Sequence, residues 1–302
     1  MATFAITGAT GFIGTALTAR LVADGHVVRR VTRTPRVPGD VGWDPEAGRL
    51  DPDALRGVDG VVHLAGDSIA GRWTERHRAA IRRSRALGTR LVAATVARLE
   101  PAPALVSASA IGYYGDRGDE ILDEASAPGA GFLADVCREW EAATAPAAAA
   151  GARVVHTRFG LVLSAHGVFL RQLLPPFRLG LGGRLGDGRA WMSAVALADV
   201  AGAVAFALGA DTLRGPVNVV GPTPVTNAEF TDLLARALHR PAVFAVPRTA
   251  LRLLLGARQA DELALASQRV LPRALLAAGY RFAHPALDDM LRAALADRAP
   301  SR

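Results

Sequence analysis

The segment Gly8-Ala9-Thr10-Gly11-Phe12-Ile13-Gly14 decides the fold, because it places three glycines between an expected strand and an expected helix. Thr3–Thr7 is a short apolar and β-branched run, and Phe12–Asp24 carries apolar residues at helical spacing. In such a turn the first glycine permits the bend, the second lets the backbone approach a diphosphate, and the third lets helix and strand pack closely. Free N–H groups at the helix start favour an anion. The segment predicts a dinucleotide site that includes Gly8, Thr10, Gly11, Phe12, Ile13 and Gly14; a glycine turn without a ligand is the alternative.

Strand-like and helix-like segments alternate as far as Gly160. The expected strands are Thr3–Thr7, Val27–Thr32, Val58–Ala65, Ala104–Ser109 and Val154–Phe159, and the expected helices are Phe12–Asp24, Thr74–Leu99 with Thr74 as N-cap, and Leu133–Ala150. This alternation is typical of an α/β fold, a Rossmann doubly wound parallel sheet.

Beyond Gly160 the pattern loosens. A loop is expected at Phe177–Gly188, helices at Val195–Leu208 and at Asn227–Leu238 with Asn227 as cap, a strand at Pro216–Val220, an extended segment at Arg240–Pro247 and a frayed tail at Ala299–Arg302. We expect an NADP-binding Rossmann domain over residues 1–165, to which residues 190–222 return. Residues 166–189 and 223–302 would form a smaller, largely helical α/β domain on the substrate side.

The end of the second expected strand indicates which dinucleotide is bound. An NAD-preferring site places Asp or Glu there to bind the ribose 2′-hydroxyl, yet no carboxylate occurs between Val27 and Gly39. Arg33 stands there instead and would meet a 2′-phosphate, with Arg30 nearby. We therefore predict NADP(H) as the cofactor, the alternative being that Arg33 is a solvated surface residue.

The composition of the chain limits the classes of binding partner that are expected. The net charge is +7, all 35 basic residues are Arg, and they are spread along the chain without a basic block, so no nucleic-acid partner is expected. No run of about 20 apolar residues appears, so no membrane partner is expected. The N-terminus runs straight into a strand, which favours a cytoplasmic protein. The single Cys and the scattered His residues make a zinc site unlikely.

Several motifs resemble the extended short-chain dehydrogenase/reductase superfamily, in particular its nucleoside-diphosphate-sugar epimerase-like branch of NAD-dependent epimerase/dehydratase-like proteins. They are the glycine segment, Leu64-Ala65-Gly66, Ser107–Gly115, Trp140-Glu141, Arg158–Leu163 and Ser267–Pro272, the last of which resembles that branch's C-terminal domain of unknown function. The resemblance covers nearly the whole chain. It implies a Rossmann domain with bound NADP(H), and it adds Leu64, Ala65 and Gly66 to the cofactor site.

The resemblance also exposes a gap in the expected chemistry. The superfamily uses a Tyr as proton donor or acceptor and a Lys four positions later. Counting back from Glu141 puts these positions near Leu133 and Cys137, and the chain has no lysine at all. The usual Tyr–Lys mechanism is therefore absent.

Three residues are the candidates to replace that pair. The resemblance places the catalytic serine at Ser109, whose hydroxyl could bond a substrate oxygen, and Tyr113 or Tyr114 could supply the acid. The alternative is that the serine bonds backbone and the tyrosines pack the turn. Cys137, the only thiol, is more often a buried small apolar residue than a reactive group.

Two functions follow from these observations. The first is an NADP(H)-dependent oxidoreductase or epimerase-like enzyme that acts on an unidentified small polar carbonyl or carbinol. The second is a non-catalytic NADP(H)-binding sensor or regulatory protein, since a Rossmann site can serve for binding alone. A homodimer is compatible with either function.

Overall fold

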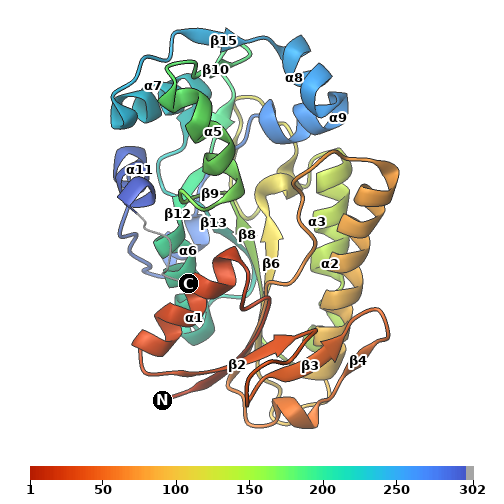
Figure 1. Ribbon diagram of the computed structural model, residues 1–302. Coiled ribbons are helices and arrows are strands. Elements are labelled where there is room, and N and C mark those ends of the chain that lie inside the picture. Colours follow the sequence, from red (N-terminus) through yellow and green to blue (C-terminus); the bar gives the residue numbers. More distant parts are fainter. Residues whose placement is uncertain (297–302) are drawn as a thin grey trace. The chain divides into compact units, whose positions relative to one another are not determined.

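An eight-stranded, mostly parallel sheet draws its strands from residues 3 to 219 of the chain (Figure 1). The computed structural model describes residues 1–296, so the tail predicted at Ala299–Arg302 lies outside the described residues. The strands, in sheet order, are β13 (Gly215–Val219), β8 (Val154–Phe159), β6 (Ala104–Ala110), β5 (Gly60–His63), β1 (Thr3–Thr7), β2 (Val27–Thr32), β3 (Val41–Asp44) and β4 (Arg49–Leu50). The predicted α/β Rossmann fold is confirmed.

The order of the strands reverses at β1. From β1 the chain moves outward through β2 and β3, and then returns to place β5 and β6 on the other side of β1. The pairs β1–β2, β1–β5, β5–β6 and β2–β3 are parallel, whereas the short β3–β4 pair is antiparallel. In sheets of this kind ligands bind at the carboxyl ends of the strands beside such a reversal.

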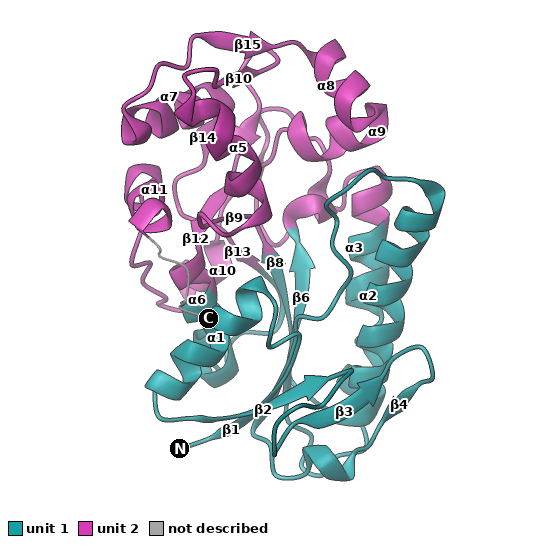
Figure 2. Ribbon diagram, viewed as in Figure 1, with its two compact units in different colours: residues 1–110, 136–158, 201–217 teal, residues 111–135, 159–200, 218–302 magenta. Residues whose placement is uncertain are grey.

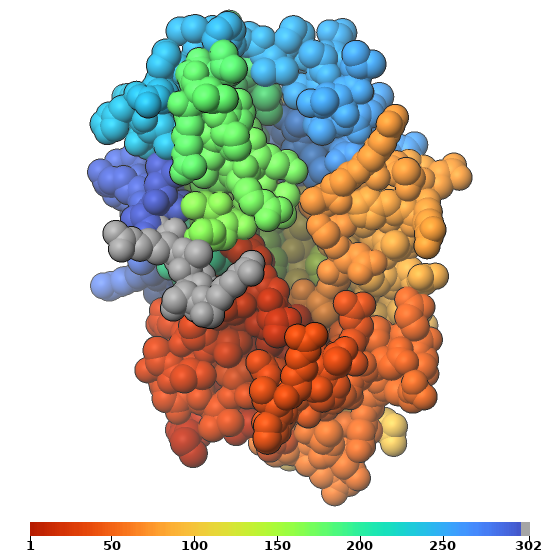
Figure 3. Space-filling model, viewed as in Figure 1, coloured from red at the N-terminus to blue at the C-terminus, as the bar shows by residue number. Residues whose placement is uncertain are grey.

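Two compact units divide the described chain (Figure 2). Unit 1 comprises Met1–Ala110, Val136–Arg158 and Ala201–Val217, and unit 2 comprises Ile111–Asp135, Phe159–Val200 and the residues from Asn218 onward. In the space-filling view the first hundred residues, red to orange, form one continuous surface of unit 1 (Figure 3).

The helices of unit 1 cover both faces of its sheet (Figure 1). They are α1 (Phe12–Ala23), α2 (Glu75–Val96), most of α3 (Phe132–Ala142), α4 (Ala145–Ala149), most of α6 (Leu197–Gly209) and the 3-10 turn η1 (Asp53–Leu55). Helix α2 packs Val92 and Val96 into one buried cluster with Val61 of β5, and each such side chain contributes about 1.5–3 kcal/mol. The predicted N-cap of α2 is confirmed, because the Thr74 hydroxyl accepts from the His77 N–H.

Unit 2 combines short paired strands with helices. Its strands are β7 (Ile121–Leu122), β9 (Leu161–Leu163), β10 (Gly183–Leu185), β11 (Trp191–Met192), β12 (Ala194–Ala196), β14 (Val225–Thr226), β15 (Phe244–Val246) and β16 (Arg269–Val270). Its helices are η2 (Ile111–Tyr114), α5 (Val168–Arg178), α7 (Asn227–Leu238), α8 (Arg248–Leu255), α9 (Ala257–Gln259), the π-helix η3 (Ala260–Ala264), α10 (Arg273–Ala277) and α11 (Leu287–Ala296). Leu170, Phe230 and Leu291 lie at the centre of its largest core.

Three predicted elements differ from the structure. The single helix expected at Leu133–Ala150 is two helices, because Pro146 lacks the N–H that a continuous helix would need there. The loop expected at Phe177–Gly188 contains β10, which pairs with β15. The N-cap of α7 is Thr226, whose hydroxyl accepts from Glu229 N–H, while the Asn227 side chain accepts from Leu185 N–H.

Replacing Gly14 tests the packing of the glycine turn. A Cβ at this position would lie 2.1 Å from the Gly8 carbonyl oxygen and 2.8 Å from Ala9 Cα, both of them backbone atoms. We expect Gly14→Ala to lower the free energy of unfolding by about 1–3 kcal/mol, measured by urea denaturation. Gly209→Ala is the control, because a Cβ there meets no atom within 4 Å. Equal stability of the two variants would contradict the close approach.

Candidate functional site

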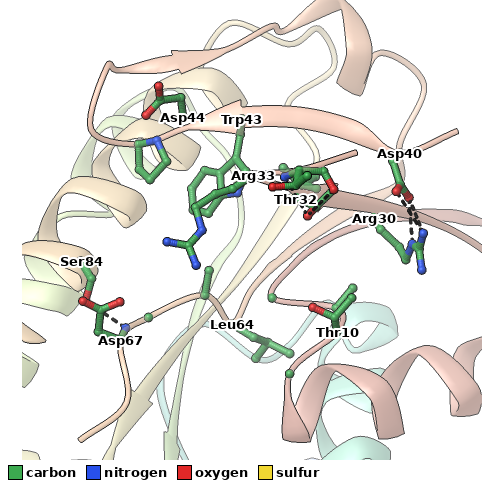
Figure 4. Close-up of a pocket in the computed structure, with 18 of the residues that line it drawn as sticks. Thr10, Arg30, Thr32, Arg33, Asp40, Trp43, Asp44, Leu64, Asp67 and Ser84 are labelled. Atoms are coloured by element: carbon green, nitrogen blue, oxygen red, sulfur yellow. Dashed lines mark hydrogen bonds and ion pairs between the residues drawn. The ribbon is translucent and has the colours of Figure 1, made fainter. Parts of the chain in front are cut away.

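A pocket of about 720 Å³ lies in unit 1 at the carboxyl ends of β1, β2 and β5 (Figure 4). The predicted cofactor residues that line it are Gly8, Thr10, Gly11, Arg33, Leu64, Ala65 and Gly66. Phe12, Ile13 and Gly14 form the first turn of α1, which begins directly after Gly11. The structure thus brings the predicted segments together at the point where the strand order reverses.

The glycine turn has the geometry of an anion cradle. Gly8 has a φ of 69°, and a Cβ there would lie 2.9 Å from the Ala65 nitrogen, so the turn can hold only glycine without strain. Gly11 is the N-cap of α1 and provides no side-chain cap, and the first turn contains no acidic residue. The first N–H groups of α1 therefore remain available to an anionic ligand, as a diphosphate requires.

The Thr7 hydroxyl ties β1 to the end of β5 at His63 and to the loop that follows it. The Thr7 hydroxyl lies 2.7 Å from His63 Nδ1 and accepts from the N–H groups of Leu64 and Ala65 at 3.2 and 3.3 Å. Because both lone pairs of the hydroxyl are used, its proton is donated to His63 Nδ1. Burial lowers the pKa of His63 to about 3, so the ring is neutral at physiological pH. Through the Thr7 hydroxyl, the buried His63 ring therefore helps to hold Leu64 and Ala65 in the pocket wall.

The two arginines at the end of β2 differ in their partners. Arg30 donates to both carboxylate oxygens of Asp40, at 2.8 and 3.0 Å. Backbone N–H donation from Arg36 is the main reason that the pKa of Asp40 lies below its usual value. Arg33 is exposed and points into the pocket (Figure 4), and no ion pair or hydrogen bond engages its guanidinium within residues 1–296. Of the two arginines, Arg33 is therefore the one whose charge can meet a ligand in the pocket.

Sequence reasoning missed part of the pocket wall. The β3–β4 hairpin contributes Trp43, Asp44, Pro45 and Glu46, and Asp67 and Ser84 complete the wall near Gly66. Trp43 is buried, and its ring lies edge-on to His63 with 6.0 Å between the centroids. The Asp44-Pro45 pair is a turn signal that could have indicated this hairpin.

Ser109 belongs to a buried polar network within unit 1. Its hydroxyl donates to Glu141 Oε1 at 2.7 Å, and the Arg158 guanidinium holds both oxygens of that carboxylate at 2.8 Å. Only 1% of Ser109 is exposed. Because the Ser109 proton is directed to Glu141, the oxygen can offer a lone pair to a further group. The sequence indicated Glu141 and Arg158 only as motif residues, and the structure gives them this orienting contact.

Cys137 occupies one of the two positions at which the Tyr–Lys pair was counted. The thiol is buried, and burial raises its pKa to about 11. It is therefore protonated at neutral pH and is a poor nucleophile. The burial of Cys137 agrees with the interpretation that it is a small buried residue and not a reactive group.

The two tyrosines lie in unit 2 and differ in exposure. Tyr114 is fully buried, and its hydroxyl donates to Asn218 Oδ1 at 2.7 Å. Tyr113 is partly buried and packs edge-on against Tyr114. Of the two, Tyr113 is the more exposed side chain.

Neither a metal centre nor a membrane-spanning helix occurs in the described part of the chain. No group of three or more His, Cys, Asp or Glu side chains within residues 1–296 could hold a metal ion. No helix in the same range is long and apolar enough to cross a membrane.

Comparison with known proteins identifies the family. Residues 4–221 match the NAD dependent epimerase/dehydratase family, and residues 246–294 match a domain of unknown function, DUF1731. The chain belongs to the NAD dependent epimerase/dehydratase family. This confirms the resemblance drawn from the motifs, including the C-terminal domain.

Relatives of this epimerase/dehydratase family member match it along nearly its whole length. Epimerase family protein Mb2239 of Mycobacterium bovis is 46% identical over 292 residues, which cover 96% of each chain. Epimerase family protein YfhF of Bacillus subtilis is 35% identical over 301 residues, covering 97% of this chain and 98% of the relative. The crystal structure of human epimerase family protein SDR39U1 (isoform 2) with NADPH superimposes with a TM-score of 0.87 at 34% identity, covering 97% and 98% of the two chains.

The buried His63 predicts a measurable pH dependence of stability. Its pKa is about 3 in the folded state, against an ordinary value of 6.5 in the unfolded chain, so the unfolded chain binds the extra proton between these values. The contribution of His63 is therefore fully present above pH 6.5 and is lost as the pH falls toward 3, by about 3 kcal/mol at pH 4. Between pH 7 and pH 4 the wild type should lose more free energy of unfolding than His63→Gln, measured by urea denaturation. If the free energy of unfolding of the wild type and of His63→Gln changed by the same amount between pH 7 and pH 4, His63 would not take up a proton on unfolding.

Proposed function

We propose that the pocket of unit 1 binds NADPH and that the chain is an NADP(H)-dependent oxidoreductase or epimerase-like enzyme acting on a small polar carbonyl or carbinol. The observation that carries the proposal is the Arg33 guanidinium, which has no ion pair or hydrogen bond among residues 1–296 and lies in a pocket that also contains the glycine turn. Arg33 would hold the 2′-phosphate, and the first turn of α1 would hold the diphosphate. The NADPH in the human SDR39U1 structure supports this choice of dinucleotide.

The chemistry divides between the cofactor and the chain. When bound, NADPH supplies the hydride that is exchanged with the substrate. In the direction in which NADP⁺ would take the hydride from a carbinol, Ser109 would accept a hydrogen bond from the substrate hydroxyl, because Glu141 and Arg158 fix the direction of its own proton. Tyr113 is the residue that we assign to proton transfer. None of these roles needs a lysine.

A second candidate is a non-catalytic NADPH-binding protein that senses redox state or regulates a partner. Two observations favour it: Cys137 is a neutral buried thiol where the pair was expected, and the Tyr114 hydroxyl donates to Asn218 inside a core. This function requires NADPH binding with no hydride transfer in a broad screen of carbonyl compounds. Reduction of any small carbonyl at ordinary enzymatic rates would exclude it.

The choice of cofactor is tested by fluorescence titration with NADPH and NADH. We expect the wild type to prefer NADPH, and Arg33→Gln to weaken NADPH binding about 10- to 100-fold, since a charge-assisted hydrogen bond contributes about 1.5–3 kcal/mol. NADH binding should not change. Arg56→Gln is the matched control, because Arg56 is exposed, pairs with Asp53 and does not line the pocket. A wild type that prefers NADH would overturn the role of Arg33.

The role of Ser109 is tested once a substrate is found. Ser109→Ala should lower kcat by about 10²-fold or more, because the substrate oxygen loses its partner beside the hydride. The affinity for NADPH, measured by the same titration, should stay the same. Glu141 keeps its ion pair with Arg158 in this variant, so the fold is preserved. Unchanged turnover would refute the role of Ser109.

A further inference from the structure

Besides Arg33, the side chain of Arg85 on helix α2 contacts the loop after β5. Arg85 donates from Nη1 to the carbonyl oxygens of Asp67 and Ile81, at 3.0 and 3.3 Å. A Cβ on Gly66 would lie 3.5 Å from the same nitrogen. Because Gly66 and Asp67 line the pocket, the guanidinium is fixed at the edge of the proposed dinucleotide site.

The Arg85 guanidinium still has donors to offer. Its Cζ atom lies 4.8 Å from the centroid of the Trp140 ring, which fixes the orientation of the planar group. Within residues 1–296 no carboxylate forms an ion pair with it, and no hydrogen bond uses its Nε or Nη2. A partly buried guanidinium with free N–H groups is suited to bind ligand oxygens.

Arg85 also adjoins the Ser109 network. The pKa of the Cys137 thiol is influenced by both the Ser109 hydroxyl and the charge of Arg85, so all three groups belong to one neighbourhood. Arg85 therefore contacts Gly66 and Asp67 in the pocket wall and also Trp140, the neighbour in sequence of Glu141, all within unit 1. A dinucleotide held at the glycine turn would therefore have the Arg85 guanidinium near Gly66 and Asp67 in addition to Arg33.

We propose that Arg85 binds the nicotinamide-side half of NADPH through its phosphate or ribose oxygens. The inference rests on the proposed function, since it requires NADPH in the pocket. Arg33 would anchor the adenosine end, and Arg85 would anchor the other end beside Ser109. In a chain without lysine, guanidinium groups do both tasks.

The test compares NADPH with adenosine 2′,5′-bisphosphate, which lacks the nicotinamide-side half. Binding is measured by calorimetry for the wild type, Arg85→Gln, Arg85→Lys and Arg33→Gln. We expect Arg85→Gln to weaken NADPH binding at least about 10-fold and to leave bisphosphate binding unchanged, with partial recovery in Arg85→Lys, which keeps the charge but not the planar donors. Arg33→Gln should weaken both ligands. Arg90→Gln, an exposed position on the same helix, should change neither.

Bisphosphate binding doubles as the control for folding of the pocket. If Arg85→Gln binds NADPH as the wild type does, the proposal for Arg85 is wrong while the proposed function stands. If Arg85→Gln weakens both ligands equally, Arg85 supports the pocket and does not bind the nicotinamide side. A wild type that binds neither ligand would overturn the proposed function, and the assignment of Arg85 with it.

Discussion

The contact between the Gly8 carbonyl and helix α1 at Gly14 is the constraint on which the site depends. The helix can start this close to β1 only because no side chain stands between them. This closeness aims the first N–H groups of α1 at the space beyond Gly8. The pocket lies there because β2 and β5 end on either side of the same turn. Sheet order, helix placement and anion cradle therefore share one cause.

Carboxylates decide which arginines of unit 1 can meet a ligand. Asp40 holds Arg30, and Glu141 holds Arg158 with two hydrogen bonds. Arg33 has no such partner within the described residues, so its charge faces the pocket. The buried pair of Glu141 and Arg158 has a different role, since removing one partner would leave a buried charge without compensation. That pair directs the hydroxyl of Ser109 and thereby sets which hydrogen bonds Ser109 can still make.

Much of the fold and part of the site could be predicted from the sequence. Strands β1, β2 and β8 begin and end at the predicted residues, because apolar β-branched runs bounded by turn residues are local signals. The β3–β4 hairpin was missed because strands of two to four residues gain stability only by pairing, here β3 with β2 and β4 with β3. The Glu141–Arg158 ion pair could not be predicted from local sequence either, because it joins a residue of helix α3 to a residue of strand β8. The burial of Tyr114 depends likewise on packing within unit 2, which its neighbours in sequence do not encode.

The protonated state of Cys137 has a consequence for how this chain can respond to oxidants. A thiol with a pKa of about 11 is ionised in only about one molecule in 10⁴ at neutral pH, and it is the thiolate that attacks peroxides. The chain has no second cysteine with which a sulfenic acid could form an internal disulfide. Oxidation of Cys137 by peroxide should therefore be slow, and it cannot end in a disulfide within this chain.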